Sequence, residues 1–500
     1  MILSSAEKMQ YLLGMNKYAV GFVLILSTPF TVLFALTSQF QSPNGQTEIC
    51  QILSHWPSAQ YSSKDIETEK SLCQLNFYGS NFFACGKNWS TSPSTLIFKK
   101  SNQFISTDQS CENKKSMDAY DKIGKFKVSM NESGTSGTFS SSSLMYYHLA
   151  RYLKTSINVP VAVSRQIDTK SHFALVTSKV RNFENQMVQT AWDYLYQAEN
   201  GNPNAIQPVR ELFTADFTKI HGALIDPIGN EKYAEHIRGK KQPQWGLQQH
   251  IEMKKTPVFR ALFSSKNFYS AQDEAVQFGL VQFKNDFSNI APTSHQMMSW
   301  MQDMSDMTVL DYLMQQQDRP GNIHFQWRIY YSSAGQLKSD RIKVVIQGVE
   351  TGLEQKFKLP KDIDRVTAIA LELPKYKKIC NLPDPCFVIQ KTVLEDNDAG
   401  GRVYYNDFFR QAGVLESLRH MNRTTYTQLF KLDQSMSSQD QTYLYLKNEF
   451  NLDSSQLKLF QNNLHQAVQI LQKSYQAGLL QLDLDFSTYF LTGKVFSTQK

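Results

Sequence analysis

An uncharged apolar segment near the N-terminus, residues 18–37, most constrains how this chain folds. The segment is 20 residues long, and an α-helix needs about 20 apolar residues to cross a bilayer. Lys8 and Lys17 precede it, and positive charge favours the cytoplasmic side of a membrane. We therefore predict a single-pass signal anchor within residues 1–40. The C-terminal bulk of the chain would lie on the periplasmic, lumenal or extracellular side.

A cleaved signal peptide is the alternative interpretation of this segment. Its apolar region usually has about 7–15 residues and ends at a small-x-small cleavage site. Residues 18–37 are longer, and residues 34–37 match such a site poorly. The sequence favours the retained anchor and leaves cleavage open.

Six cysteines support an oxidising compartment. An even number outside the cytosol indicates disulfides. Two bridges are expected within residues 41–115 and one small loop later in the chain. The pairing of the first four stays open among three connectivities. Zinc is the alternative, but the sequence has no CxxC pair with matching histidine spacing. The cysteines are Cys50, Cys73, Cys85 and Cys111 in the first group, and Cys380 and Cys386 in the second.

Composition bounds the class of protein. A chain of 500 residues suggests two or three packed units. Charged residues make up 19% and apolar residues 41%, which is typical of a globular protein. The net charge of +7 is not concentrated in a basic run, so nucleic acid is not an expected partner.

The first half of the exported chain divides into two predicted parts. Residues 38–48 are polar, contain Pro43 and Gly45, and are typical of a linker. Residues 41–115 are predicted as a cysteine-rich extension, mostly irregular or β. A small α+β lobe is expected over residues 116–185. Its predicted elements are strands at 125–130, 158–163 and 172–176 and a helix at 141–153.

Residues 186–500 are predicted as a larger, mainly helical lobe with a strand-rich insertion at about 325–390. A helical pattern at 307–314 breaks at Arg319-Pro320-Gly321. Another helix begins at Asp453 or Ser454 and carries a core stripe. The insertion's strands are expected at 327–331, 342–346, 366–371 and 387–393. The stripe consists of Leu457, Phe460, Leu464, Ala467, Val468 and Leu471.

Two loops carry residues suited to phosphoryl transfer. One is Asp318-Arg319-Pro320-Gly321-Asn322 after an apolar helix, and the other is Asp396-Asn397-Asp398-Ala399-Gly400-Gly401 after a strand. Phosphoryl transfer needs a carboxylate that orients the acceptor hydroxyl and oxygen ligands that hold a divalent cation on the phosphates. Asp318 fits the first role. Asn322 with Asp396 or Asp398 fits the second, with Mg or Mn as the cation.

These motifs resemble those of Golgi secretory-pathway kinases and four-jointed kinases, and more distantly HipA-like and phosphatidylinositol kinases. Those families share an Asp-Arg loop after an apolar helix and a later Asp-Asn-Gly-like metal loop. The resemblance covers about residues 120–400 and extends to a helix before Val159-Pro160. It implies that Lys127, or with less support Lys125, contacts phosphate. It also makes Gly134 and Gly137 candidates for a phosphate-covering loop.

Ser143 departs from this family pattern, because it stands where the helix of the small lobe would offer a glutamate to the lysine. The resemblance therefore implies either an active kinase or a pseudokinase. The fold class expected is α+β, a two-lobed protein-kinase-like fold with a transmembrane anchor and a disulfide-rich extension. Each loop taken singly is also a good turn sequence, and the second resembles a calcium loop.

The predicted function is that of a membrane-anchored kinase-like protein. It would transfer the γ-phosphate of ATP to a hydroxyl of a protein, glycan or lipid outside the cytosol. The alternative is a non-catalytic pseudokinase or a partner-binding exported protein. The sequence does not identify the acceptor.

Overall fold

The computed structural model describes residues 37–130, 135, 137–227, 233–243, 246–282, 294–341, 345–346, 349–350, 386–401, 406–450 and 452–495. The predicted anchor lies outside these residues, except for Thr37, which begins strand β1 (Thr37–Gln41). Among the described residues, no helix combines the length and the apolar character that crossing a membrane requires.

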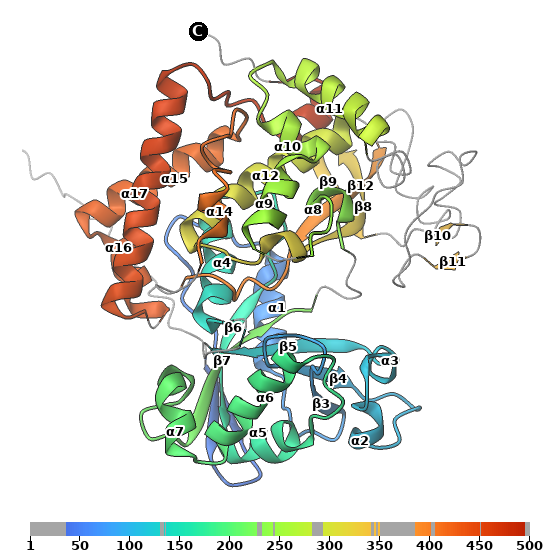
Figure 1. Cartoon of the computed structure of the whole chain (residues 1–500), viewed down its shortest axis with the longest axis vertical. Helices are drawn as coiled ribbons and strands as arrows, with labels where there is room; N and C mark the ends of the chain where they lie inside the picture. The colour runs from blue at the N-terminus through green and yellow to red at the C-terminus, as the bar shows by residue number, and fades with distance from the viewer. Residues whose placement is uncertain are drawn as a thin grey trace, which may run out of the picture. The chain divides into compact units, whose positions relative to one another are not determined.

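A seven-stranded antiparallel sheet dominates one part of the molecule (Figure 1). Its strand order is β1-β2-β6-β7-β5-β4-β3. Neighbouring strands often come from distant parts of the sequence, as when β5 pairs with β7. The remaining strands are β2 (Thr47–Gln51), β3 (Phe82–Gly86), β4 (Ser94–Lys99), β5 (Lys122–Val128), β6 (Ala162–Asp168) and β7 (Lys219–Ile225).

The predicted linker at residues 38–48 is wrong. Strands β1 and β2 form a hairpin there, with Gly45 at φ 75° in its turn. Strand β1 lies at the edge of the sheet and alternates between exposed and half-buried residues. A polar edge strand is hard to tell from a linker by composition, since edge strands favour polar residues. Residues 41–115 therefore supply strands to the same sheet as residues 116–185.

The strand predicted at residues 172–176 is also wrong, since helix α5 (Thr169–Leu175) occupies this stretch. The side chain of Asp168 accepts a hydrogen bond from the backbone N–H of Ser171, which caps the helix as β6 ends. An aspartate N-cap of this kind favours helix over a second strand.

Strand β7 lies at the centre of the sheet, although it falls within the region predicted as mainly helical.

Two disulfides close within the first part of the chain. Cys50 bonds to Cys73 and Cys85 bonds to Cys111, which resolves the pairing that the sequence left open. Cys386 is also disulfide-bonded, while Cys380 lies outside the described residues. These bridges are typical of secreted and lumenal proteins.

Removing the Cys50–Cys73 bridge by a double alanine substitution is expected to lower the free energy of unfolding by about 3 kcal/mol. The bridge spans 23 residues of sequence, and a loop of this size restricts the unfolded chain by about that amount. Urea denaturation of the oxidised protein and the variant measures the difference. An unchanged denaturation midpoint would contradict this expectation.

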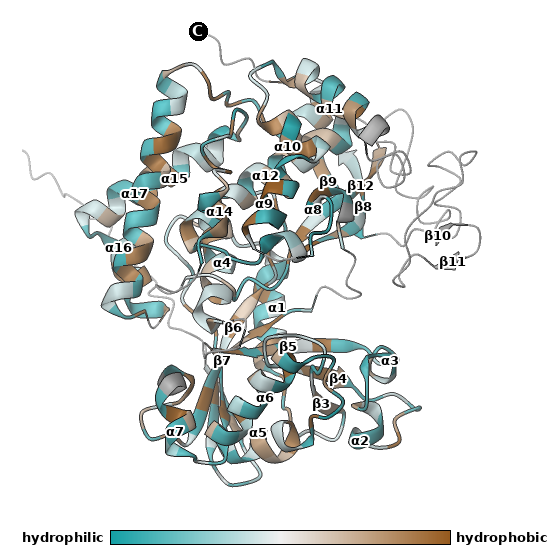
Figure 2. Cartoon of the chain, viewed as in Figure 1, coloured by the Kyte–Doolittle hydropathy of each residue, from teal (hydrophilic) through white to brown (hydrophobic). Residues whose placement is uncertain are grey.

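The second part of the molecule is mainly helical and surrounds α12 (Ser294–Met314). Helix α12 is buried along nearly its whole length, which confirms the predicted helix at 307–314. Helix α17 (Ser454–Gln476) is capped by Asp453, and its six predicted stripe residues are all buried. Figure 2 shows hydrophobic and hydrophilic residues alternating along α17, as an amphipathic helix requires.

A three-stranded sheet of order β12-β8-β9 packs against α12. It confirms the strands predicted at 327–331 and 387–393. Of the other two, 366–371 lies outside the described residues, and only Val345–Ile346 is a described strand within 342–346. The strands are β8 (Ile323–Ser333), β9 (Gln336–Arg341), β10 (Val345–Ile346), β11 (Val349–Glu350) and β12 (Cys386–Leu394).

The remaining helices complete the two parts. They are α1 (Ser63–Cys73), α2 (Thr107–Ser110), α3 (Lys114–Met117), α4 (Ser140–Tyr152), α6 (Gln186–Glu199), α7 (Pro203–Ile206), α8 (Glu235–Arg238), α9 (Leu247–Lys254), α10 (Pro257–Leu262), α11 (Phe268–Gln282), α14 (Phe408–Gln411), α15 (Arg423–Ser438), α16 (Gln441–Glu449) and α18 (Phe486–Thr492), with 3₁₀ turns η1 (Thr177–Lys179), η2 (Gln207–Leu212) and η3 (Arg319–Gly321).

Candidate functional site

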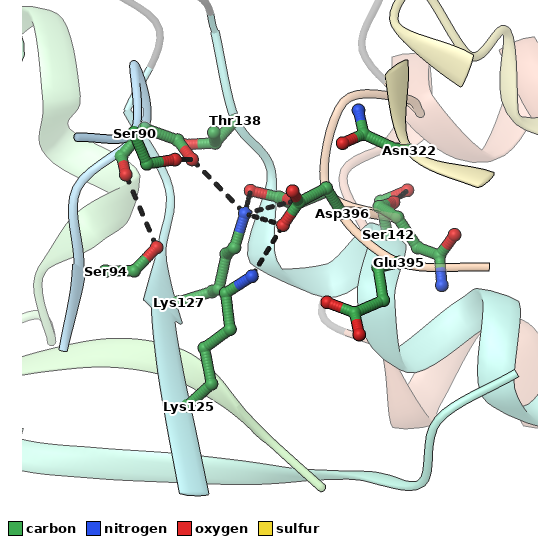
Figure 3. Close-up of polar contacts among 12 residues, drawn as sticks. Ser90, Ser94, Lys125, Lys127, Thr138, Ser142, Asn322, Glu395 and Asp396 are labelled. Carbon is green, nitrogen blue, oxygen red and sulfur yellow. Dashed lines mark hydrogen bonds and ion pairs between the residues drawn. The ribbon is translucent and has the colours of Figure 1, made fainter. Parts of the chain in front are cut away.

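Two lysines of β5 meet two aspartates of the loop after β12. Lys125 and Lys127 are two residues apart on a strand, so their side chains leave the same face of the sheet. Lys127 Nζ lies 2.8 Å from Asp398 Oδ1 and 2.7 Å from Asp396 Oδ1. Lys125 Nζ lies 2.6 Å from Asp396 Oδ1. Figure 3 shows both ammonium groups pointing at Asp396. The structure thus joins residues more than 260 positions apart in the chain.

The two aspartates differ in their exposure. The Asp398 side chain is 1% exposed, whereas the Asp396 side chain is 21% exposed. Burial by itself would raise the pKa of Asp396, but Lys125, Lys127 and Lys87 hold it well below its usual range. Asp396 therefore remains a carboxylate that a ligand from solvent can reach. Its backbone has φ 47°, a left-handed conformation that Asp tolerates better than most residues.

The glycines after Asp398 allow the loop to approach the end of α12. A Cβ atom on Gly400 would lie 2.6 Å from the carbonyl oxygen of Met314. The N–H of Gly401, at φ 80°, donates to the same carbonyl. A side chain at position 400 would push the loop away from the helix. The pair Gly400-Gly401 therefore has a packing role, distinct from that of the carboxylates before it.

The loop at 318–322 lies directly against this second loop. The N–H of Gln317 donates to the carbonyl of Ala399 at 3.0 Å, and the N–H of Glu395 donates to the carbonyl of Asn322 at 3.2 Å. Arg319 is fully buried and donates to the carbonyl of Glu395 at 3.0 Å. The two motifs that the sequence singled out are therefore neighbours in space.

Asp318 and Asn322 form a small turn at the site. The Asn322 amide donates to the carbonyl of Asp318 at 2.7 Å and to Asp318 Oδ2 at 3.1 Å. Asp318 itself is half-buried. These bonds hold the Asp318 carboxylate in place. They use the N–H groups of the Asn322 amide, whose oxygen is the atom that can accept a hydrogen bond or bind a cation.

The hairpin between β3 and β4 also contacts Lys127, and this contact was not predicted from the sequence. Ser92 Oγ accepts a hydrogen bond from Lys127 Nζ at 3.2 Å. Lys87, at the start of the hairpin, is one of the charges that lower the pKa of Asp396. Ser90 and Ser94 are drawn on the same side in Figure 3. The available signal was a Ser-rich turn between two apolar runs, which predicts a hairpin without locating it.

The predicted phosphate-covering glycines are only partly described. Gly134 lies outside the described residues. Gly137 has φ 71° and precedes Thr138, whose backbone pairs with Met130 beyond the end of β5. The β3–β4 hairpin and the loop at 396–398 both contribute contacts to the lysine ammonium groups.

Ser143 lies on α4, 3% exposed, and among the described residues its hydroxyl has no hydrogen-bond partner. The counter-charge for Lys127 therefore comes from Asp398 and Asp396. The ion pairs of Lys127 with Asp396 and Asp398 thus connect strand β5 to the loop at 396–398.

The site's donors suit a hard divalent cation. Carboxylate and amide oxygens are the ligands that Mg and Mn prefer. The lysines contact Asp396 through Oδ1, so a cation would be held through Oδ2, the other carboxylate oxygen. No group of three or more His, Cys, Asp or Glu in the described part of the chain is arranged to hold a metal ion. The residues fit a cation shared with a phosphate ligand better than one enclosed by protein alone.

Solved structures similar to this chain include two at low sequence identity. No family model matches the chain, and no curated protein matches it. A solved structure described as the Golgi casein kinase is 10% identical, with a TM-score of 0.39, covering 85% of this chain and 79% of its own. A structure of hydra Fam20 with sugar is 12% identical, with the same TM-score, covering 85% and 94%.

The Golgi casein kinase among these structures is of the kind that the sequence motifs resemble. A TM-score of 0.39 carries no argument about function. The proposal below depends on the geometry of the site.

Proposed function

We propose that this protein is a divalent-metal-dependent phosphotransferase that moves the γ-phosphate of ATP to a hydroxyl of a protein, glycan or lipid. The observation that carries the proposal is the contact of Lys127 with Asp396 and Asp398, in a loop to which the 317–322 segment is hydrogen-bonded at Glu395 and Ala399. Two lysines, two carboxylates and an amide are the groups that a metal-bound triphosphate requires.

Lys125 and Lys127 would neutralise the phosphates, with Ser92 of the β3–β4 hairpin accepting a hydrogen bond from Lys127 beside them. Asp398 is the more buried aspartate and holds Lys127 through both carboxylate oxygens, at 2.8 and 2.9 Å. It takes the place of the glutamate that α4 lacks. This division leaves the more exposed Asp396 for the cation.

Asp396 and Asn322 would hold Mg or Mn. Asp398 would lie nearby, bound to Lys127 and not directly to the cation. The bound cation would neutralise negative charge on the phosphates. Asp318 would orient the acceptor hydroxyl and accept its proton as the phosphoryl group transfers. Its turn with Asn322 fixes that carboxylate next to the loop that carries Asp396.

Asp396→Ala is expected to abolish the thermal stabilisation that Mn²⁺ and ATP give the full chain. Ligands at about 100 times their Kd add about 2.7 kcal/mol to the stability of the folded state, and the variant should lose nearly all of it. Asp193→Ala, the same substitution at an exposed position of α6, is the matched control and should keep the shift. A wild-type chain that shows no shift at saturating Mn²⁺ and ATP would overturn the proposed function.

A nucleotide-binding pseudokinase is the second candidate, and one observation favours it. Ser143 leaves α4 without a carboxylate where Lys127 and Lys125 lie. Nucleotide binding without turnover would support this candidate. Turnover that Asp318→Asn removes would support the active enzyme.

The membrane anchor at residues 18–37 is part of the proposal. The disulfides Cys50–Cys73 and Cys85–Cys111 support a compartment outside the cytosol. Alkaline carbonate extraction of membranes and protease protection of the chain test the anchor and its orientation. The acceptor substrate remains to be identified by phosphorylation of candidate proteins, glycans and lipids.

A further inference from the structure

One face of helix α4 is hydrogen-bonded to the loop at 395–398, both directly and through other buried residues. The N–H of Phe139, at the helix start, donates to the carbonyl of Asp398 at 2.8 Å. Ser142 Oγ donates to the carbonyl of Asn397 at 2.7 Å. Tyr146 OH donates to Asp311 Oδ1 at 2.8 Å. Positions 139, 142 and 146 are three and four residues apart, so they share a face of the helix.

The Tyr146 contact continues through two more buried groups to the same loop. Asp311 receives Arg319 Nε at 2.8 Å and Arg319 Nη2 at 2.9 Å. Arg319 Nη2 then donates to Asn397 Oδ1 at 2.8 Å. Tyr146, Asp311 and Arg319 are each 0% exposed. A continuous buried chain of hydrogen bonds therefore runs from α4 through α12 and the 318–322 loop to Asn397.

The protonation state of Tyr146 suits this arrangement. Burial, and next the charge of Asp311, raise the pKa of Tyr146 well above its usual value, so the phenol stays neutral and donates. The helix start is also unusual, because Phe139 offers no side-chain cap and two serines of the first turn bond to groups outside the helix. Ser140 Oγ contacts Ser129, and Ser142 Oγ reaches the loop.

Helix α4 offers no glutamate to the lysines, and its connection to the loop at 395–398 is made by the hydrogen bonds described above. We propose that Ser142 and Tyr146 are positioning residues that supply it. With the Phe139 N–H, they form an α4 clamp that holds the loop at 395–398 where Asp396 and Asp398 face the lysines. This inference rests on the proposed function for its consequence in binding, while the clamp is itself a testable property of the fold.

The test compares Tyr146→Phe and Ser142→Ala with Tyr147→Phe in the full chain. Tyr147 is equally buried, and its hydroxyl donates to Glu69 Oε1 at 2.8 Å, away from the loop. The control thus loses a similar hydroxyl bond on the same helix. If Tyr146→Phe does not fold, Ser142→Ala, which removes a single oxygen atom, still decides the question.

Two measurements are made on each variant. The first is hydrogen exchange of the Glu395 amide, which donates to the carbonyl of Asn322. We expect exchange at least tenfold faster in Tyr146→Phe and Ser142→Ala and within twofold of wild type in Tyr147→Phe. The second is the Kd of Mn²⁺-ATP, expected to rise at least tenfold in the clamp variants and to stay within twofold in the control.

The outcomes separate the clamp from the proposed function. Equal acceleration of exchange in Tyr147→Phe, or none in either clamp variant, would overturn the clamp. A wild-type chain that does not bind Mn²⁺-ATP would refute the proposed function, and the exchange rates would still decide the clamp. Faster exchange with an unchanged Kd would overturn the positioning role.

Discussion

Asp318→Asn is expected to lower phosphotransfer turnover by about 10²–10⁴-fold, the usual contribution of a positioned general base. Asparagine keeps the shape of the side chain but accepts no proton from the acceptor hydroxyl. Asp318 is half-buried, and the Asn322 amide donates to its carbonyl as well as to its carboxylate. The turn should therefore persist, and the melting temperature should change little. Single-turnover assays with radiolabelled ATP measure the effect.

Asp193→Asn serves as the control for this experiment, since it makes the same chemical change at an exposed position of α6. Its turnover should equal that of the wild type. A fall in turnover of less than fivefold in Asp318→Asn would remove Asp318 from the catalytic role. Nucleotide affinity should remain within a few-fold in both variants, because the proposed site assigns Asp318 to the acceptor hydroxyl and the phosphates to the lysines and the cation.

Arg319→Met is expected to lower the free energy of unfolding by about 3–5 kcal/mol, since it leaves the buried charge of Asp311 without its partner. Both side chains of this ion pair are 0% exposed, and Arg319 Nε lies 2.8 Å from Asp311 Oδ2. Arg319 also donates to Glu395 and Asn397, so the loop of Asp396 should loosen with it. Urea denaturation followed by tyrosine or tryptophan fluorescence measures the loss.

The double variant Arg319→Met with Asp311→Leu tests whether the unpaired charge of Asp311 causes the loss of stability. Removing both charges should recover most of the lost stability, because replacing a whole buried ion pair by apolar side chains is often nearly neutral. Metal-nucleotide binding should stay weak, since Asn397 loses its partner in both cases. Losses that simply add in the double variant would show that the unpaired charge is not the reason.

Local sequence patterns were sufficient to predict helices α17 and α12. The core stripe of α17 and its Asp453 cap follow from spacing within one helix, and the structure has both. Helix α12 and the break at Arg319-Pro320-Gly321 are equally local. The apolar and polar residues involved lie within a few turns of one another. No information from elsewhere in the chain was needed to place them.

The residues of the candidate site could be predicted from the sequence, but their pairing could not. The motifs Asp318-Asn322 and Asp396-Asp398 and the lysines of β5 stood out as residue types suited to phosphate and metal. That Lys127 takes Asp398 as its partner did not follow, because the two residues are separated by 271 positions. Ser92 was not found for the same reason. Its hairpin carries no charge pattern of its own, and only strand pairing brings it to Lys127.

The sequence by itself determined the amphipathic helices, an even set of cysteines suited to an oxidising compartment, and the two polar loops. The tertiary structure decided the rest. It made β1–β4 part of one sheet with β5–β7, selected the pairs Cys50–Cys73 and Cys85–Cys111, and joined α4 to Asn397 through Tyr146 and Arg319. Strand pairing, disulfide closure and buried ion pairs connect residues distant in the chain. Their partners are therefore fixed by the packing of the whole fold, which local patterns do not encode.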